Sequence, residues 1–393
     1  MDSRTSRRYL PALLAVLLSR LALALLATGA LTAHITLLLL PAASLFGQTT
    51  PSNIGPNPPP RVNEDLTVTY FLNAPNAKEV LLADTAVSPG PPGRPLTKGP
   101  DGMWSVTAGP YEVGTHYYGF LIDGVLTGDL GGTAVTDRLS RGFLLFESID
   151  VRGPEPLFTG IRPVPHGTIH IETFGSRALQ REVRCFVYTP PGWLPGEQLP
   201  VVYLLHGDLH DAAAWSTTGY AERIADNLIA GGQARRVLLA MPDTGTDNRR
   251  NLPTDVVEPY LISESFPFVE GKYLGRPAAE RYLAGLSAGA SHTRYTGLRN
   301  PALFRGLGIF SGGGVAAGVV LEDLFPTLRQ PDLYRDMKVV SIAVGLDDSA
   351  LANVRRLSES LDRLGIRNQL SVTTGGHTWF NWRRYLAEFL KGI

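Results

Sequence analysis

The sequence predicts a small all-β sandwich followed by an α/β domain whose mostly parallel sheet is flanked by helices. Three observations predict this order. Short alternating runs separated by turn residues fill 62–150, strand-length apolar runs alternate with helical patterns over 151–393, and a glycine-flanked serine at 287 follows one of these runs. The 393 residues leave room for two folded units and a leader.

The composition is that of an ordinary globular protein. Hydrophobic residues make up 44% and charged residues 18% of the chain, which permits a sizeable core. Basic and acidic residues number 36 each, so there is no excess positive charge for a nucleic-acid partner. The single cysteine, Cys185, excludes an intramolecular disulfide and multi-cysteine metal sites, and its apolar surroundings predict a buried side chain.

Residues 1–47 are expected to be a signal peptide or a membrane anchor. Three arginines precede a long apolar stretch, 10–40, and small residues follow it. The stretch is longer than the apolar part of an ordinary signal peptide, so an uncleaved anchor stays open, and only then is a membrane partner expected. In either case we expect export to the periplasm or the medium.

A spacer and a β-rich region follow the leader. The proline-rich tract 48–61 favours extended, solvated backbone and is interpreted as a linker. Region 62–150 has the turn-separated short strands of an all-β sandwich. The expected strands include 66–71, 79–82, 103–106 and 116–120.

Region 151–393 carries the pattern of an α/β domain. The apolar runs 201–205, 237–240 and 282–284 are nearly continuous, as in strands buried on both faces of a parallel sheet. Between them, 220–230 and 256–268 carry apolar residues at three- and four-residue spacing, which predicts helices.

The segment 285–289, Gly-Leu-Ser-Ala-Gly, fits the G-x-S-x-G nucleophile elbow. It follows a predicted strand and precedes a helix-compatible stretch, where small residues allow the strained turn that exposes a serine hydroxyl. Ser287 is therefore the candidate nucleophile. A serine hydroxyl needs a neighbouring base and a third group that orients the base.

His377 is the candidate base, and an aspartate at 347 or 348 is the candidate acid. His377 lies late in the chain, in a glycine-rich loop ahead of a terminal helix. Asp347 and Asp348 follow the predicted strand 339–345, at the end of a parallel strand where catalytic groups gather. The amides of Ala288 and Asp208 are the expected oxyanion donors. For His206, a structural role is favoured over proton transfer.

Several motifs, in this order, resemble those of the "putative esterase" family, which includes feruloyl esterases, enterochelin esterases and mycolyltransferases. The motifs are Leu204-Leu205-His206-Gly207, Ala214-Trp215, Leu239-Ala240-Met241-Pro242-Asp243, Ala284-Gly285-Leu286-Ser287-Ala288-Gly289, Gly345-Leu346-Asp347-Asp348-Ser349 and Gly375-Gly376-His377. The resemblance covers most of 164–393 and implies an α/β-hydrolase fold. It implies Asp348 as the acid and supports Asp208 and Ala288 as oxyanion donors. Trp215 and Trp379 are candidate substrate contacts.

The sequence departs from this family at two places. The segment 208–211 is bulkier and more polar than the glycine-rich run that relatives often carry, and Ala288 stands where methionine is common. Both departures bear on the choice of substrate.

Region 62–150 is similar to early-set immunoglobulin-like modules, which include glycogen-binding ones. Its aromatic residues Trp104, Tyr118 and Phe120 could stack on sugar rings or form the sandwich core. The core interpretation is favoured, because aromatic residues on strands usually pack inward.

The expected activity is hydrolysis of a carboxylic ester through an acyl-serine intermediate, without a metal or an organic cofactor. The expected substrate is a small-molecule or carbohydrate-linked ester, such as a feruloyl, acetyl or siderophore-type ester. Acyl transfer to a sugar hydroxyl, of the mycolyltransferase type, is an alternative that the residues leave open. A non-catalytic glycan-binding protein is a further alternative, although it would be expected to have lost a triad residue.

Overall fold

The computed structural model describes residues 57–84, 93–128, 133–139, 142–153, 157–208, 210–245 and 252–393. The leader expected at 1–47 lies outside the described residues, and so does most of the proline-rich spacer. Among the residues that are described, no helix has both the length and the apolar character of a membrane span.

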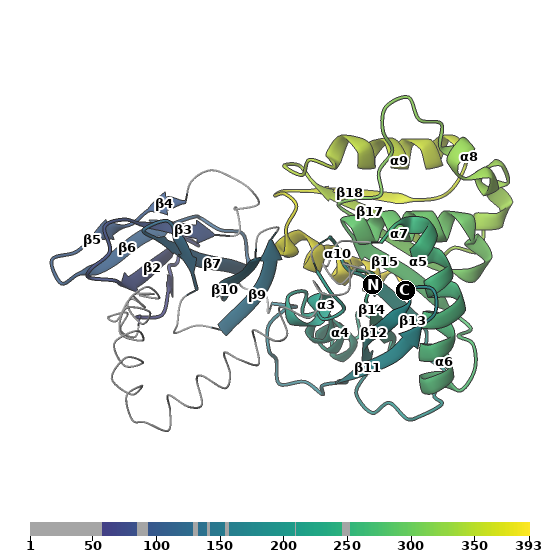
Figure 1. The fold of residues 1–393 in the computed structure, drawn as a ribbon, viewed down its shortest axis with the longest axis horizontal. Coiled ribbons are helices and arrows are strands. Elements are labelled where there is room, and N and C mark those ends of the chain that lie inside the picture. Colours follow the sequence, from purple (N-terminus) through teal and green to yellow (C-terminus); the bar gives the residue numbers. More distant parts are fainter. Residues whose placement is uncertain are drawn as a thin grey trace, which may run out of the picture. The chain divides into compact units, whose positions relative to one another are not determined.

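Residues 61–151, called the first domain below, form two antiparallel sheets (Figure 1). One sheet has the strand order β1-β2-β6-β5, and the other has the order β4-β3-β7-β10-β9, with β8 paired to β7. The bounds are β1 (Arg61–Val62), β2 (Val68–Asn73), β3 (Val80–Asp84), β4 (Arg94–Pro95), β5 (Thr97–Lys98), β6 (Met103–Ala108), β7 (Gly114–Ile122), β8 (Val125–Thr127), β9 (Thr133–Leu139) and β10 (Gly142–Val151).

The two sheets share one apolar core, which contains the aromatic residues singled out in the sequence. Trp104, Tyr118 and Phe120 are 7%, 1% and 0% exposed. The Trp104 indole N–H donates to the backbone oxygen of Ala74 at 2.8 Å, so its polar atom is satisfied inside the sandwich. The core interpretation of these aromatics is confirmed, and none of the three offers a free ring face to a sugar.

Residues 168–393, called the second domain below, are built on an eight-stranded mixed sheet. Its strand order is β11-β12-β14-β13-β15-β16-β17-β18. Strands β11 and β12 pair antiparallel with their neighbours, whereas all pairs from β14 to β18 are parallel. The bounds are β11 (Thr168–Ser176), β12 (Arg181–Thr189), β13 (Val201–Leu205), β14 (Leu238–Pro242), β15 (Arg281–Leu286), β16 (Gly306–Phe310), β17 (Val339–Gly345) and β18 (Gln369–Thr373). The predicted strands 201–205, 237–240, 282–284 and 339–345 are confirmed.

Helices cover both faces of this sheet (Figure 1). Their bounds are α3 (Ala214–Thr217), α4 (Ala221–Ala230), α5 (Thr254–Tyr260), α6 (Phe266–Leu274), α7 (Ala288–Arg299), α8 (Leu321–Leu324), α9 (Leu351–Arg363) and α10 (Trp379–Lys391). The short 3-10 helices are η2 (Pro301–Leu303), η3 (Pro326–Arg329) and η4 (Pro331–Tyr334). The helix predicted at 256–268 is longer than expected and includes a π-helical turn, η1 (Leu261–Ser265). Pro259 and Pro267 flank this turn and cannot donate regular helical hydrogen bonds.

Strand β13 explains why the sheet is buried on both sides. Val201, Tyr203 and Leu205 point into the core that contains α5, α6, α7 and α9, whereas Val202 and Leu204 point into the core that contains α3, α4 and α10. Both sets are apolar, which accounts for the continuous hydrophobic run in the sequence.

The sheet topology gathers the candidate catalytic residues at one edge. Strands β13, β15, β16, β17 and β18 are neighbours and run parallel. Their carboxyl ends therefore lie side by side, and the loops that carry 206–208, Ser287, 347–348 and 374–377 all leave the sheet at that edge.

Candidate active site

Ser287 lies on a strained turn between β15 and α7. Its backbone has φ 55° and ψ −116°, a conformation that non-glycine residues rarely adopt. The glycines around it are needed for close packing: a Cβ at Gly285 would lie 2.5 Å from the backbone of Gly289, and a Cβ at Gly289 would lie 2.4 Å from the Leu205 carbonyl oxygen. The small residues of the motif thus allow the turn to sit against β13 with the serine at its apex.

The structure brings Ser287, His377 and Asp348 together from three distant parts of the chain. The Ser287 Oγ lies 3.0 Å from Nε2 of His377, and the other ring nitrogen, Nδ1, lies 3.0 Å from the Asp348 Oδ2. With Nδ1–H donating to the carboxylate, Nε2 is left unprotonated to accept the serine proton. This arrangement can carry out nucleophilic catalysis.

Asp348, and not Asp347, faces the imidazole. Asp348 is 4% exposed, and its carboxylate also accepts the Ala350 backbone N–H at 2.9 Å. Burial alone would raise the pKa of this carboxyl group, but the hydrogen bond and charge interaction with His377 lower the pKa below its ordinary value. The neighbouring Asp347 has an exposed side chain, and its backbone N–H donates to the Gly375 oxygen.

The loop that carries His377 is held by residues for which the sequence analysis had no role. Asn381, fully buried on α10, donates from Nδ2 to the carbonyl oxygens of Thr374 and Gly376, both at 3.0 Å. The Trp382 ring stands edge-on to the imidazole with a centroid distance of 4.9 Å. A signal for Asn381 was available, because it is a polar residue among the apolar residues Trp379, Trp382 and Tyr385 in the first turns of the helix.

The loop after β13 lies against the nucleophile, where the expected oxyanion donors belong. A Cβ at Gly207 would lie 3.2 Å from the Ser287 Cβ, so the backbone at 207–208 passes close to the serine. Ala288 is the first residue of α7, and its N–H is therefore at the positive end of the helix. The two residues expected to supply the oxyanion donors therefore lie near the nucleophile, one in the loop after β13 and one at the start of α7.

His206 is surrounded by partners that fix it in the structure. It is 1% exposed, its Nδ1 lies 2.9 Å from the Gly207 oxygen, and the Thr244 backbone N–H donates to its Nε2 at 3.0 Å. Since both ring nitrogens are occupied inside the protein, the geometry favours the structural role.

The two tryptophans expected to contact substrate are packed beneath the site. Trp215 and Trp379 are 1% and 3% exposed, and their rings meet edge to face at 5.3 Å. The Trp215 indole donates to the Leu205 oxygen at 3.0 Å. This geometry favours support of the site over direct contact with substrate.

His292, five residues after the candidate nucleophile on α7, is a buried imidazole that contacts neither His377 nor Asp348 through a hydrogen bond. It is 2% exposed, and neither ring nitrogen has a hydrogen-bond partner among the described residues. Burial, together with charge repulsion from His206, lowers the pKa of His292 to about 4. The side chain is therefore neutral in the folded protein near neutral pH.

This histidine predicts a loss of stability in mild acid. The unfolded chain takes up a proton near pH 6.5 and the folded chain does so only near pH 4, so the free energy of unfolding falls by about 3 kcal/mol across that window. Urea unfolding between pH 7 and pH 4 should show this loss in the native protein and a shallower decline in His292→Leu. Identical pH dependence in both proteins would refute the assignment.

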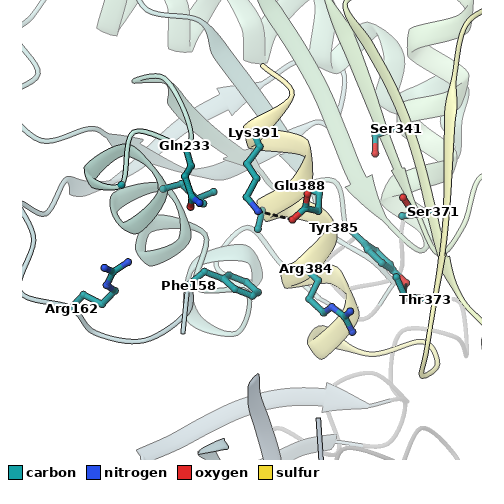
Figure 2. A pocket seen from close by; sticks show the side chains of 14 residues that line it. Phe158, Arg162, Gln233, Ser341, Ser371, Thr373, Arg384, Tyr385, Glu388 and Lys391 are labelled. Atoms are coloured by element: carbon teal, nitrogen blue, oxygen red, sulfur yellow. Dashed lines mark hydrogen bonds and ion pairs between the residues drawn. The ribbon is translucent and has the colours of Figure 1, made fainter. Parts of the chain in front are cut away.

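A cavity of about 680 Å³ lies behind the catalytic loop, between α10 and the strands β17 and β18. Figure 2 shows Tyr385, Glu388 and Lys391 on α10, with Thr373 beside Tyr385. The Thr373 hydroxyl and the Tyr385 hydroxyl are hydrogen-bonded at 2.7 Å. Since none of the three triad residues lines this cavity, the chemistry is assigned to the edge of the sheet that carries Ser287.

In the described part of the chain, no three His, Cys, Asp or Glu side chains gather as they would to hold a metal ion.

Comparisons with known proteins place this geometry among esterases. The family model described as "Putative esterase" matches residues 176–393. The "Endo-1,4-beta-xylanase/feruloyl esterase" of Xylanibacter ruminicola is 28% identical over 350 residues, which are 85% of this chain and 46% of that protein. The chain thus spans about half the length of this curated relative.

Two solved structures show the similarity of fold. The enterobactin esterase of Shigella flexneri, in the presence of 2,3-dihydroxy-N-benzoyl-glycine, has 16% identity and a TM-score of 0.64, with 86% of this chain and 96% of that chain covered. A variant of the feruloyl esterase module from Clostridium thermocellum, complexed with sinapinate, has 19% identity and a TM-score of 0.53, with 60% and 90% covered. These similarities indicate an α/β-hydrolase-like fold.

Proposed function

The chain belongs to the "Putative esterase" family and is an esterase, and from this premise we propose that it hydrolyses carboxylic esters through an acyl-serine intermediate on Ser287. The observation that carries the proposal is the continuous chain of hydrogen bonds from Ser287 through His377 to Asp348, 3.0 Å at each step.

Each proton in the proposed cycle moves through Nε2 of His377. The imidazole takes the serine proton as Oγ attacks the ester carbonyl, and the amides of Asp208 and Ala288 stabilise the tetrahedral oxyanion. The protonated imidazole then gives that proton to the departing alkoxide as the C–O bond breaks, which leaves the acyl-serine. A water molecule, deprotonated by the same nitrogen, attacks the acyl group, and the proton returns to the serine oxygen as the acid leaves.

The names of the relatives suggest feruloyl esters of carbohydrates or siderophore-type esters as substrates of this chain. We further propose that residues 62–150 are an early-set immunoglobulin-like module and that the protein is exported. The alternative activity is acyl transfer, in which the acyl-serine passes its acyl group to an alcohol instead of water. An added alcohol acceptor would then yield a new ester product.

The proposal is tested by a panel of chromogenic esters with graded acyl size, followed by a phosphonate inhibitor that labels activated serines. We expect turnover of at least one ester, inactivation at one equivalent of bound phosphonate, and a labelled peptide that contains Ser287. Labelling at another serine, or turnover that persists after full labelling, would overturn the proposed mechanism.

A further inference from the structure

The first domain forms part of the wall of the cavity at the catalytic histidine. This cavity, of about 700 Å³, has a volume typical of ligand sites. His377 and its loop residues line one side, and Arg94, Tyr111 and Glu112 of the first domain line the other. The first domain is therefore close enough to the reacting groups to contact a substrate.

Buried contacts fix the first domain at this position. Arg383 on α10 is 1% exposed and donates to the Thr115 oxygen of β7 at 2.9 Å, while two further N–H groups donate to the Thr218 oxygen at 3.0 and 2.6 Å. The Tyr117 hydroxyl of β7 donates to the same Thr218 oxygen at 2.7 Å. Since a buried guanidinium is costly without such partners, these contacts hold β7 firmly against the second domain.

Glu112 extends this attachment to the catalytic loop itself. Its carboxylate accepts hydrogen bonds from the Thr374 hydroxyl, three residues before His377, and from Arg384 at 2.9 Å. Beside it, the His116 ring stacks on Phe380 with a centroid distance of 4.7 Å. The cavity wall and the catalytic loop are thus joined by side chains from both domains.

The chemistry of the reaction assigns a role to this side of the site. The protonated His377 must deliver its proton to the leaving oxygen, so the alcohol part of an ester lies beside the imidazole. Of the residues in the proposed cycle, His377 lines the cavity, whereas Ser287, Asp208 and Ala288 do not. The cavity therefore adjoins the imidazole that protonates the departing alcohol.

Five of the seven residues that the first domain contributes to this wall have polar side chains. The Arg94 and Glu112 side chains are 54% and 46% exposed and carry opposite charges, while the Tyr111 hydroxyl donates at 2.6 Å to the buried Asp84. Arg94 also lies 3.6 Å from that carboxylate, which holds it at the cavity rim. A donor and an acceptor at fixed positions suit an alcohol that bears several hydroxyl groups.

We propose that Arg94 and Glu112 form a subsite of the esterase for the leaving alcohol, which selects esters of polyhydroxylated, sugar-like alcohols over esters of simple alcohols. This proposal rests on the proposed function. In this proposal the first domain contacts the ligand through Arg94 in the edge strand β4 and Glu112 in the loop before β7. The aromatic residues of its strands are buried in the core and do not take part.

The test compares two esters of one acid, chosen as the acid whose chromogenic ester is hydrolysed fastest: its methyl ester and its 6-O-glucose ester. In the native protein, kcat/KM should be higher for the glucose ester. In Arg94→Met and in Glu112→Gln, kcat/KM for the glucose ester divided by kcat/KM for the methyl ester should fall about tenfold, because a hydrogen bond to a charged group is lost. The change should come chiefly from a higher KM for the glucose ester.

Arg335→Met is the matched control, because Arg335 is an exposed arginine directly after η4 and outside the cavity. The ratio of the two kcat/KM values in this variant should equal that of the native protein. Circular dichroism confirms folding of each variant. If the native protein hydrolyses no ester of the chromogenic panel, the proposed function fails. If it hydrolyses chromogenic esters but does not prefer the glucose ester to the methyl ester, the subsite proposal alone is overturned. If it hydrolyses both and the ratio is unchanged in both variants, the subsite proposal alone is overturned.

Discussion

Replacing Ser287 with alanine is expected to lower kcat for the best chromogenic ester by a factor of about 10⁵ to 10⁶. The substitution removes the oxygen that lies 3.0 Å from Nε2 of His377, and no acyl-enzyme can then form. Substrate binding does not depend on this oxygen, so KM should change much less than kcat. Steady-state kinetics with enough enzyme to detect residual turnover would measure both quantities.

Ser291→Ala is the control for this experiment. Ser291 lies one turn further along α7, so its substitution removes a hydroxyl from the same helix without touching the imidazole. We expect its kcat to stay within a factor of about two to three, as for a surface substitution away from the reacting atoms. Turnover that survives in Ser287→Ala at a level similar to this control would place the nucleophile elsewhere.

The sequence pattern was sufficient to predict that Ser287, His377 and an aspartate lie close together, because parallel strands impose a common edge. A glycine-flanked serine after β15, an aspartate pair after β17 and a histidine after β18 have to meet once the strands are ordered as neighbours. The same pattern could not separate Asp347 from Asp348. Both follow the strand directly, and only the turn, in which the Asp347 N–H binds the Gly375 oxygen, decides which carboxylate points inward.

The contribution of the first domain to the cavity could not be predicted from local patterns. Glu112 and Thr374 are 262 residues apart, and neither belongs to a motif. Their contact depends on how the two domains dock, which in turn depends on Arg383, a charged residue buried in the helix α10. A buried arginine is exceptional, so the residue type predicts a solvent-exposed side chain, although position 383 shares a helix face with the buried Trp379 and Leu386.

Replacing Asp348 with asparagine is expected to lower kcat by a factor of about 10⁴ while leaving the fold intact. The amide has the same shape as the carboxylate, but it can donate its own N–H to Nδ1 of His377. The imidazole then carries its proton on Nε2 and can no longer accept the proton of Ser287. The loss should appear in kcat, measured with the methyl ester at saturating concentration.

Asp347→Asn separates this electrostatic effect from a general disturbance of the turn. The two aspartates are adjacent and follow the same strand, yet only Asp348 contacts the imidazole, with 3.0 Å between Oδ2 and Nδ1. Because Asp347 also lines the cavity at His377, kcat and not KM is the quantity to compare, and it should change less than about tenfold. A loss of kcat in Asp347→Asn as large as that in Asp348→Asn would mean that orientation of the loop, and not the charge behind the histidine, controls the proton transfer.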